Sequence, residues 1–172
     1  MTRKHTLCKS CRERGANESM LREAHSYRGD PAVPAFPDDR LIVIFDGDCV
    51  MCSAFAQLIM RRDPEKRFRL LAARTPLGAA LYTHFGLVAD DYESNILLED
   101  GRAYIKSEGS IRILERLGMP WSLIRIARVL PLPLRDRIYQ FIARNRLRWF
   151  GRRQGCYRPE PSQAGRFIEG EW

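Results

Sequence analysis

Long hydrophobic runs are missing from this chain of 172 residues. No stretch approaches the roughly 18 uninterrupted apolar residues of a membrane-spanning helix, and the polar, basic start has no apolar stretch typical of a secretory signal. We therefore expect a cytoplasmic protein without a transmembrane segment. The length suits one substantial hydrophobic core with peripheral additions, and two full domains would not fit.

Acidic residues are nearly absent from the last third of the chain. Residues 112–158 contain twelve arginines and two acids, Glu115 and Asp136, a net charge of +10, whereas the whole chain carries +8. A basic surface of this kind suits weak contact with an anionic partner: nucleic acid, a membrane surface or an acidic protein. A solvated helix face is the simpler interpretation of the same pattern.

Cysteine is scarce, with five residues in the whole chain. Because this number is odd, a fully paired secreted framework is excluded, and catalytic or metal chemistry in a reducing compartment suits the chain better. Four of the cysteines form two Cys-x-x-Cys pairs and the fifth stands alone: Cys8 with Cys11, Cys49 with Cys52, and Cys156. For Cys156 we expect a fixed position in the tail. The alternative is a third thiol that reaches the active site.

The first cysteine pair lies between two histidines, in the spacing His-x2-Cys-x2-Cys-x13-His. These side chains are candidate zinc ligands, although their spacing does not match the common zinc-finger classes: His5, Cys8, Cys11 and His25. An accessory redox pair and incidental thiols in a mobile tail are the other interpretations. Residues 1–40 are polar and end in a proline-rich stretch, which predicts a largely disordered extension with a loose helix around 17–25.

The second cysteine pair stands between an apolar run and a helical run. Residues 41–45 predict a buried strand, and a helix is expected from Cys49 to residue 62. A thiol at a helix start meets unpaired N–H groups and the positive end of the helix dipole, and both favour thiolate. Cys49 is therefore the expected nucleophile, exposed at the turn. Cys52 lies within disulfide reach as the resolving thiol. Two buried core thiols are the alternative interpretation, which the acidic turn before the pair disfavours, and no further zinc ligands follow at a second-pair spacing.

The residues before Cys49 form an acidic turn, Asp46-Gly47-Asp48. Asp46 ends the predicted strand, and its carboxylate would accept the proton of Cys52 if burial raises its pKa. A purely architectural role in the turn is the alternative for Asp46. We expect Gly47 to permit the turn and Asp48 to cap the helix.

The remaining pattern predicts the element order β-α-β-α-β-β-α. After the first strand and helix, strands are expected at 68–72, 95–98 and 103–105, and helices at 76–85 and 107–117. Thr75 and Ser107 are the candidate caps of these two helices. With a Cys-x-x-Cys pair opening the first helix, this order is the minimal thioredoxin-like core of an α/β fold.

Two further helices are expected after this core, at 121–130 and 134–149, separated by Pro131 and Pro133. The predicted organisation is an N-terminal extension, a redox core, a basic helical extension packed on that core, and a tail. Their ranges are 1–40, 41–118, 119–160 and 161–172.

These residues resemble the DCC family of thiol-disulfide oxidoreductases, bacterial proteins of thioredoxin-like type. The match covers about residues 40 to 160 and rests on these segments: 44–52, 106–107, 131–136, Tyr139, 143–153 and Cys156. The resemblance implies dithiol–disulfide exchange with Asp46, Cys49 and Cys52 as signature residues, and Ser107 as a possible accessory. It implies no cofactor beyond the redox-active disulfide. The expected partners are a disulfide-containing protein or small-molecule thiol as substrate and an unidentified thiol as electron donor.

One departure from thioredoxins concerns the substrate. Thioredoxins place a proline just before the third strand, facing the cysteine pair, whereas this chain reads Tyr92-Glu-Ser-Asn95. Substrate geometry is therefore expected to differ, or the substrates are small thiols.

Two other hypotheses fit parts of the sequence. Residues 41–50 also match the opening of haloacid-dehalogenase-like phosphatases, with Asp46 as nucleophile, Asp48 as acid/base and Mg²⁺ as cofactor. Such an enzyme needs an acidic pair after a late strand, and Asp90-Asp91 precedes one. The second hypothesis is a non-enzymatic module whose arginine-rich helices bind nucleic acid or a membrane surface.

Overall fold

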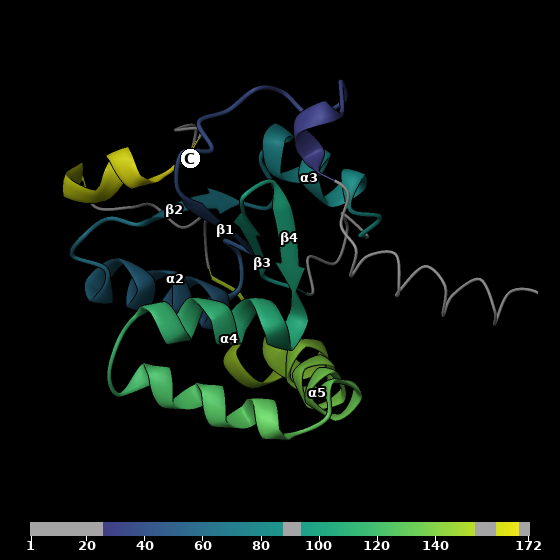
Figure 1. Cartoon of the computed structure of the whole chain (residues 1–172), viewed down its shortest axis with the longest axis vertical. Helices are drawn as coiled ribbons and strands as arrows, with labels where there is room; N and C mark the ends of the chain where they lie inside the picture. Colours follow the sequence, from purple (N-terminus) through teal and green to yellow (C-terminus); the bar gives the residue numbers. More distant parts are fainter. Residues whose placement is uncertain (1–25, 88–93, 154–160, 169–172) are drawn as a thin grey trace, which may run out of the picture.

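Strand β1, Leu41–Phe45, is the central strand of the computed structural model, which describes residues 26–87, 94–153 and 161–168 (Figure 1). Four of its five side chains are buried, as expected for a continuous apolar run covered on both faces. Within the described residues it belongs to a four-stranded sheet in the order β2-β1-β3-β4. β2 (Phe68–Ala72) is parallel to β1, β3 (Ile96–Glu99) is antiparallel to β1, and β4 (Arg102–Ile105) is antiparallel to β3.

Helices cover both faces of this sheet (Figure 1). They are α2 (Val50–Arg62), α3 (Pro76–His84), α4 (Lys106–Arg116) and α5 (Leu132–Phe150). Val43 and Phe45 face the core under α2 and α4, whereas Ile42 and Ile44 face the core under α3. This alternation follows the two-residue period of a strand. The expected order β-α-β-α-β-β-α is confirmed, and the fold is a thioredoxin-like α/β fold.

Capping follows the prediction at α3 and departs from it at α4. Thr75 Oγ1 accepts a hydrogen bond from the N–H of Gly78 at 3.1 Å, and Pro76 occupies the first helical position. No side chain in the described part of the chain caps the start of α4. Ser107 lies in the first turn of α4, and its hydroxyl donates to Asp136 of α5. The prediction that Ser107 caps its helix is wrong, and Ser107 joins two helices.

The segment after α4 forms the two expected helices, and the first of them is a 3₁₀ helix. Residues Trp121–Val129 make a 3₁₀ helix, η2, and α5 runs from Leu132 to Phe150 with Pro131 as its N-cap. Both η2 and α5 pack on α4, and α5 also contacts α2. The predicted basic extension therefore reaches the helix that carries the cysteine pair.

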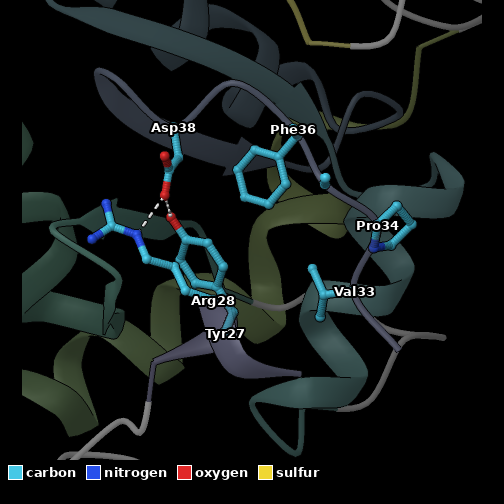
Figure 2. A pocket seen from close by; sticks show the side chains of 7 residues that line it. Tyr27, Arg28, Val33, Pro34, Phe36 and Asp38 are labelled. Atoms are coloured by element: carbon cyan, nitrogen blue, oxygen red, sulfur yellow. Dashed lines mark hydrogen bonds and ion pairs between the residues drawn. The ribbon is translucent and has the colours of Figure 1, made fainter. Parts of the chain in front are cut away.

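Residues 26–40 are packed onto the domain, which corrects the expected disorder for this part of the extension. A short 3₁₀ helix, η1 (Tyr27–Gly29), places the Tyr27 ring in the core, stacked on Phe36 with ring centroids 5.2 Å apart. Figure 2 shows Tyr27 and Arg28 converging on one Asp38 oxygen, at 3.0 and 2.7 Å. Burial is the main cause that raises the pKa of Tyr27 to about 12.

Residues 161–168 are also tied to the sheet. Helix η3 (Pro161–Arg166) is followed by Phe167, which bridges Leu70 of β2, and the N–H of Ile168 donates to the Leu70 carbonyl at 2.9 Å. Residues 161–168 of the predicted tail therefore pack against β2.

Several sequence predictions lie outside the described residues. These are the loose helix at 17–25, the candidate zinc ligands and the fifth cysteine: His5, Cys8, Cys11, His25 and Cys156. Among the helices that the structure describes, none is long and apolar enough to cross a membrane.

Candidate active site

The turn between β1 and α2 places the second cysteine pair at a helix start. Cys49 has an extended backbone (φ −87°, ψ 124°) and is the N-cap of α2, and its Sγ accepts a hydrogen bond from the N–H of Cys52 at 3.4 Å. The sulfur thus takes the place of the oxygen in an ordinary capping side chain. The prediction that Asp48 caps this helix is wrong by one residue. The Asp48 carboxylate instead pairs with Arg74 at 2.9 Å.

Both thiols are free and buried, with exposed fractions of 0% for Cys49 and 4% for Cys52. The expectation of an exposed Cys49 is therefore wrong in this conformation. The chain that leaves α5, Gly151–Arg153, runs back along the turn, and we call it the return segment. Arg152 forms an antiparallel bridge with Cys49, and the N–H of Arg153 donates to the Asp48 carbonyl at 2.8 Å.

The environment separates the pKa values of the two thiols. The pKa of Cys49 is lowered to about 6, chiefly by a hydrogen bond from the Cys52 thiol, with further lowering by the Cys52 N–H and the charge of Arg146. Burial and the charge of Asp46 act in the opposite direction. The pKa of Cys52 is raised, because its hydrogen is used in the bond to Cys49 and because it is buried. Both shifts favour the thiolate at Cys49 and the protonated thiol at Cys52.

A buried ion pair lies beside the cysteines. The guanidinium of Arg146, on α5, meets Asp46 Oδ2 at 3.3 Å, and both side chains are almost fully buried. Asp46 Oδ1 accepts from the N–H of Asp48 at 3.1 Å, which supports the architectural role in the turn. The same carboxylate stands close enough to shift the pKa values of both cysteines. Its role as the proton acceptor of Cys52 stays a hypothesis.

Gly47 takes part in the turn through its backbone. Its carbonyl accepts a hydrogen bond from the buried Ser53 hydroxyl of α2, at 3.1 Å. This bond fixes the turn against the first residues of α2, so Gly47 has a structural contact on the cysteine side of the sheet.

A cavity of about 230 Å³ opens beside Cys52. Its lining is largely apolar and includes Met51, Phe55, Ile142 and Tyr139 along with Arg146. Ser110 lines it, while Ser107, one turn earlier on α4, is absent from the lining. Such a lining suits an apolar group of a substrate next to a thiol.

Tyr139 contacts the segment in which the sequence departs from thioredoxins. Its hydroxyl accepts a hydrogen bond from the N–H of Asn95, the residue immediately before β3, at 3.2 Å. Burial raises the pKa of Tyr139 to about 12, so the phenol stays neutral. In this conformation the Asn95 N–H is engaged by Tyr139, and an extended substrate would have to displace the phenol to use it.

Arg146 and Tyr139 belong to the segments that carry the family resemblance, but the sequence analysis assigned neither of them a role at the site. On α5, Tyr139, Ala143 and Arg146 recur at the i, i+4 and i+7 positions of one helix face, and this face is turned to the site. The signal was present, since an arginine at a core-facing position indicates a buried partner of opposite charge. It was hidden among eleven other arginines of the same segment.

Removing the Arg146 charge is expected to raise the pKa of Cys49 by roughly one unit or more, because the lost cation favoured the thiolate and Asp46 would remain unpaired. The measurement is the pH dependence of Cys49 alkylation by iodoacetamide, with wild type showing a midpoint near 6. Arg146→Met should move the midpoint upward, and Arg146→Lys should move it less. Arg144→Met, a charge loss on the exposed side of the same helix, is the matched control. An unchanged midpoint in Arg146→Met would contradict this assignment.

Comparison with known proteins identifies the family. The profile of the family described as DCC1-like thiol-disulfide oxidoreductase matches residues 43–152, from β1 to the return segment. The chain is 36% identical over 127 residues to the uncharacterised protein YuxK of Bacillus subtilis, covering 74% of this chain and 93% of YuxK. It is 33% identical over 120 residues to a chloroplastic DCC family protein of Arabidopsis thaliana, covering 69% of this chain and 70% of that protein. No solved structure matches. The chain belongs to the DCC1-like family of thiol-disulfide oxidoreductases.

Proposed function

We propose that this protein catalyses dithiol–disulfide exchange with Cys49 as the nucleophile and Cys52 as the resolving thiol. The observation that carries the proposal is the asymmetry of the pair: the Cys49 sulfur caps α2 and its pKa is lowered to about 6, whereas the pKa of Cys52 is raised. A pair of this kind holds one reactive thiolate and one proton at neutral pH.

The reaction has two balanced steps. The Cys49 thiolate attacks one sulfur of a substrate disulfide, forms a mixed disulfide and releases the other substrate sulfur as a thiolate. Cys52 then loses its proton and attacks Cys49 Sγ, which forms the Cys49–Cys52 disulfide and releases the second substrate thiolate. Two electrons pass from the cysteine pair to the substrate. Asp46, whose charge acts on Cys52, is the candidate to receive the proton of Cys52.

Burial of Cys49 means that the first step requires movement. The return segment covers the turn, held by the 2.8 Å bond from Arg153 to Asp48 and a longer 3.5 Å bond from the Val50 N–H to the Gly151 carbonyl. We assign the opening to this segment because Arg152 bridges Cys49 directly. Its displacement breaks few bonds and leaves the sheet intact.

The proposed substrates are disulfide-containing proteins or small disulfides, and a thiol donor would reduce the oxidised pair again. The apolar cavity beside Cys52 favours substrates with an apolar group next to the sulfur. A cytoplasmic location, where thiol donors are abundant, suits this direction of exchange.

Trapping the mixed disulfide tests the proposal. In a background with Cys8, Cys11 and Cys156 changed to serine, Cys52→Ser is expected to gain one glutathione from glutathione disulfide, located at Cys49 by peptide mass spectrometry. Cys49→Ser in the same background should react far more slowly at neutral pH, because the pKa of Cys52 is raised. Faster adduct formation on Cys52 than on Cys49 would reverse the roles, and adducts on neither would refute the proposal.

The phosphatase hypothesis gains no support from the geometry. Asp46, its nucleophile, is buried against Arg146, and Asp48, its acid/base, pairs with Arg74. Within the part of the chain that the structure describes, no group of three histidine, cysteine, aspartate or glutamate side chains is placed to hold a metal ion. Mg²⁺-dependent phosphate release that survives Cys49→Ser would restore this hypothesis.

A further inference from the structure

Large apolar side chains are exposed on one part of this molecule. Of thirteen such side chains among the described residues, twelve lie between positions 119 and 150, on η2, α5 and their connections. Both elements lie beyond α4, on the side of the molecule opposite α3 (Figure 1). We call this surface the η2–α5 face. Its exposed apolar residues are Met119, Leu123, Ile124, Ile126, Val129, Leu130, Leu134, Ile138, Phe141, Ile142, Trp149 and Phe150.

The 3₁₀ geometry of η2 aligns its apolar side chains. With three residues per turn, residues three apart lie directly above one another, so Leu123, Ile126 and Val129 form one row. Ile126 is 64% exposed and Val129 is 86% exposed, and none of the η2 side chains is buried. Contact between so much apolar surface and water is unfavourable in free energy unless another surface covers the row.

Helix α5 carries a second row beside a line of arginines. Leu134, Ile138 and Phe141 follow at i, i+4 and i+7, and Phe141, 61% exposed, makes an edge contact with Trp149 at 5.5 Å between ring centroids. Arg137, Arg144 and Arg148 lie at similar spacing along the neighbouring strip of the helix, and all three are exposed. The helix therefore pairs an apolar strip with a basic one.

The charge of this face is positive. Arg125, Arg137, Arg144 and Arg148 make no ion pair with any residue in the ranges 26–87, 94–153 and 161–168. The sequence between 119 and 150 contains a single acid, Asp136, which accepts the hydrogen bond from Ser107. A covering partner must therefore be apolar and anionic together.

We propose that the η2–α5 face docks on an anionic membrane surface. The apolar rows would enter the boundary between headgroups and acyl chains, and the arginines would lie at the phosphates, as in other interfacial helices. Trp149 is of a type enriched at this boundary, and phenylalanines such as Phe141 are common on the apolar face of interfacial helices. A second copy of the chain would bring two positive faces together, and nucleic acid would leave the aliphatic row without a partner, since bases stack on aromatic side chains.

Docking would place the cavity beside Cys52 near the membrane. Ile142 is exposed on the η2–α5 face and also lines that cavity, so the mouth of the cavity adjoins the docking surface. The proposal concerns attachment and does not depend on the thiol chemistry.

Sedimentation with vesicles tests the proposal on the full chain. Vesicles of equal parts phosphatidylcholine and phosphatidylglycerol should bind the protein, with affinity falling as salt rises, and vesicles of phosphatidylcholine alone should bind it much less. Changing Arg137, Arg144 and Arg148 to glutamine should weaken binding roughly 100-fold. The matched control changes Arg40, Lys66 and Arg102 to glutamine. These exposed residues lie at or near the N-terminal ends of strands β1, β2 and β4, away from the η2–α5 face. This variant should therefore bind vesicles like wild type.

A second measurement examines the apolar row. Ile126→Ser with Val129→Ser should remove salt-resistant binding and keep weak adsorption at low salt, and both residues are exposed, so the fold should be retained. Three results would each overturn the proposal. The wild-type protein could bind neutral and anionic vesicles equally well, or the control triple variant could lose as much vesicle binding as the Arg137, Arg144 and Arg148 variant. The third is a dimer in solution that Ile126→Ser dissociates. Cys49→Ser should bind vesicles like wild type, which separates this test from the proposed function.

Discussion

Cys49→Ser is expected to lower the rate of insulin or glutathione mixed-disulfide reduction by roughly 1000-fold or more, since loss of the nucleophile in a covalent mechanism returns the reaction toward its background rate. Cys52 should not replace it, because its raised pKa leaves little thiolate at pH 7. The fold should survive the substitution, because a serine hydroxyl can accept the capping bond from the Cys52 N–H that Cys49 Sγ now accepts.

The measurement is steady-state turnover with a thiol donor in excess, alongside thermal unfolding of each variant. The double variant Cys8→Ser with Cys11→Ser is the control for the other Cys-x-x-Cys pair and is expected to keep wild-type turnover. Full activity in a folded Cys49→Ser protein would exclude the assigned nucleophile. Loss of activity in the control would transfer a redox role to the N-terminal pair.

Asp63→Ala is expected to lower the free energy of unfolding by about 3–5 kcal/mol, the usual cost of leaving one partner of a buried ion pair alone. The Asp63 side chain is fully buried at the end of α2 and meets Arg166 at 2.6 Å. It also accepts hydrogen bonds from the N–H groups of Arg67 and Phe68, at 3.1 and 2.9 Å. One carboxylate therefore joins the end of α2, the start of β2 and the C-terminal segment.

Urea unfolding followed by circular dichroism measures this effect. Glu65→Ala is the matched control, because Glu65 is exposed and pairs with Arg67 at 3.4 Å, an interaction worth about 1 kcal/mol or less. The double variant Asp63→Ala with Arg166→Met should recover part of the loss, since it removes the unpaired buried cation. Similar losses in Asp63→Ala and Glu65→Ala would show that the buried pair has no special role.

Local patterns in the sequence were enough for most of the fold. The apolar run at 41–45 and the candidate cap Thr75 each identify an element from a few adjacent residues, and each element forms as expected. The cysteine pair was located in the same way, because a strand end followed by a helix start places a thiol near unpaired N–H groups.

The features that escaped prediction depend on contacts between distant residues. Arg146 meets Asp46 across 100 positions of sequence, and Arg152 bridges Cys49 across a similar span. Local periodicity shows which side of a helix is apolar, and it does not show which strand end that side will meet. Tyr27 was missed for the same reason, because a single aromatic in a polar segment has no pattern that marks it as core.

Helix α5 connects three parts of the molecule in one rigid piece. It presents Phe141 to the outside and Arg146 to the cysteine pair, and it ends in the return segment over Cys49. A small rotation of this helix on a lipid surface would shift Arg152 relative to Cys49, the residue that it bridges. Thermodynamic reciprocity then links the two ends of the helix: if lipid attachment changes access to the thiolate, the redox state of the pair must change the affinity for lipid by the same factor.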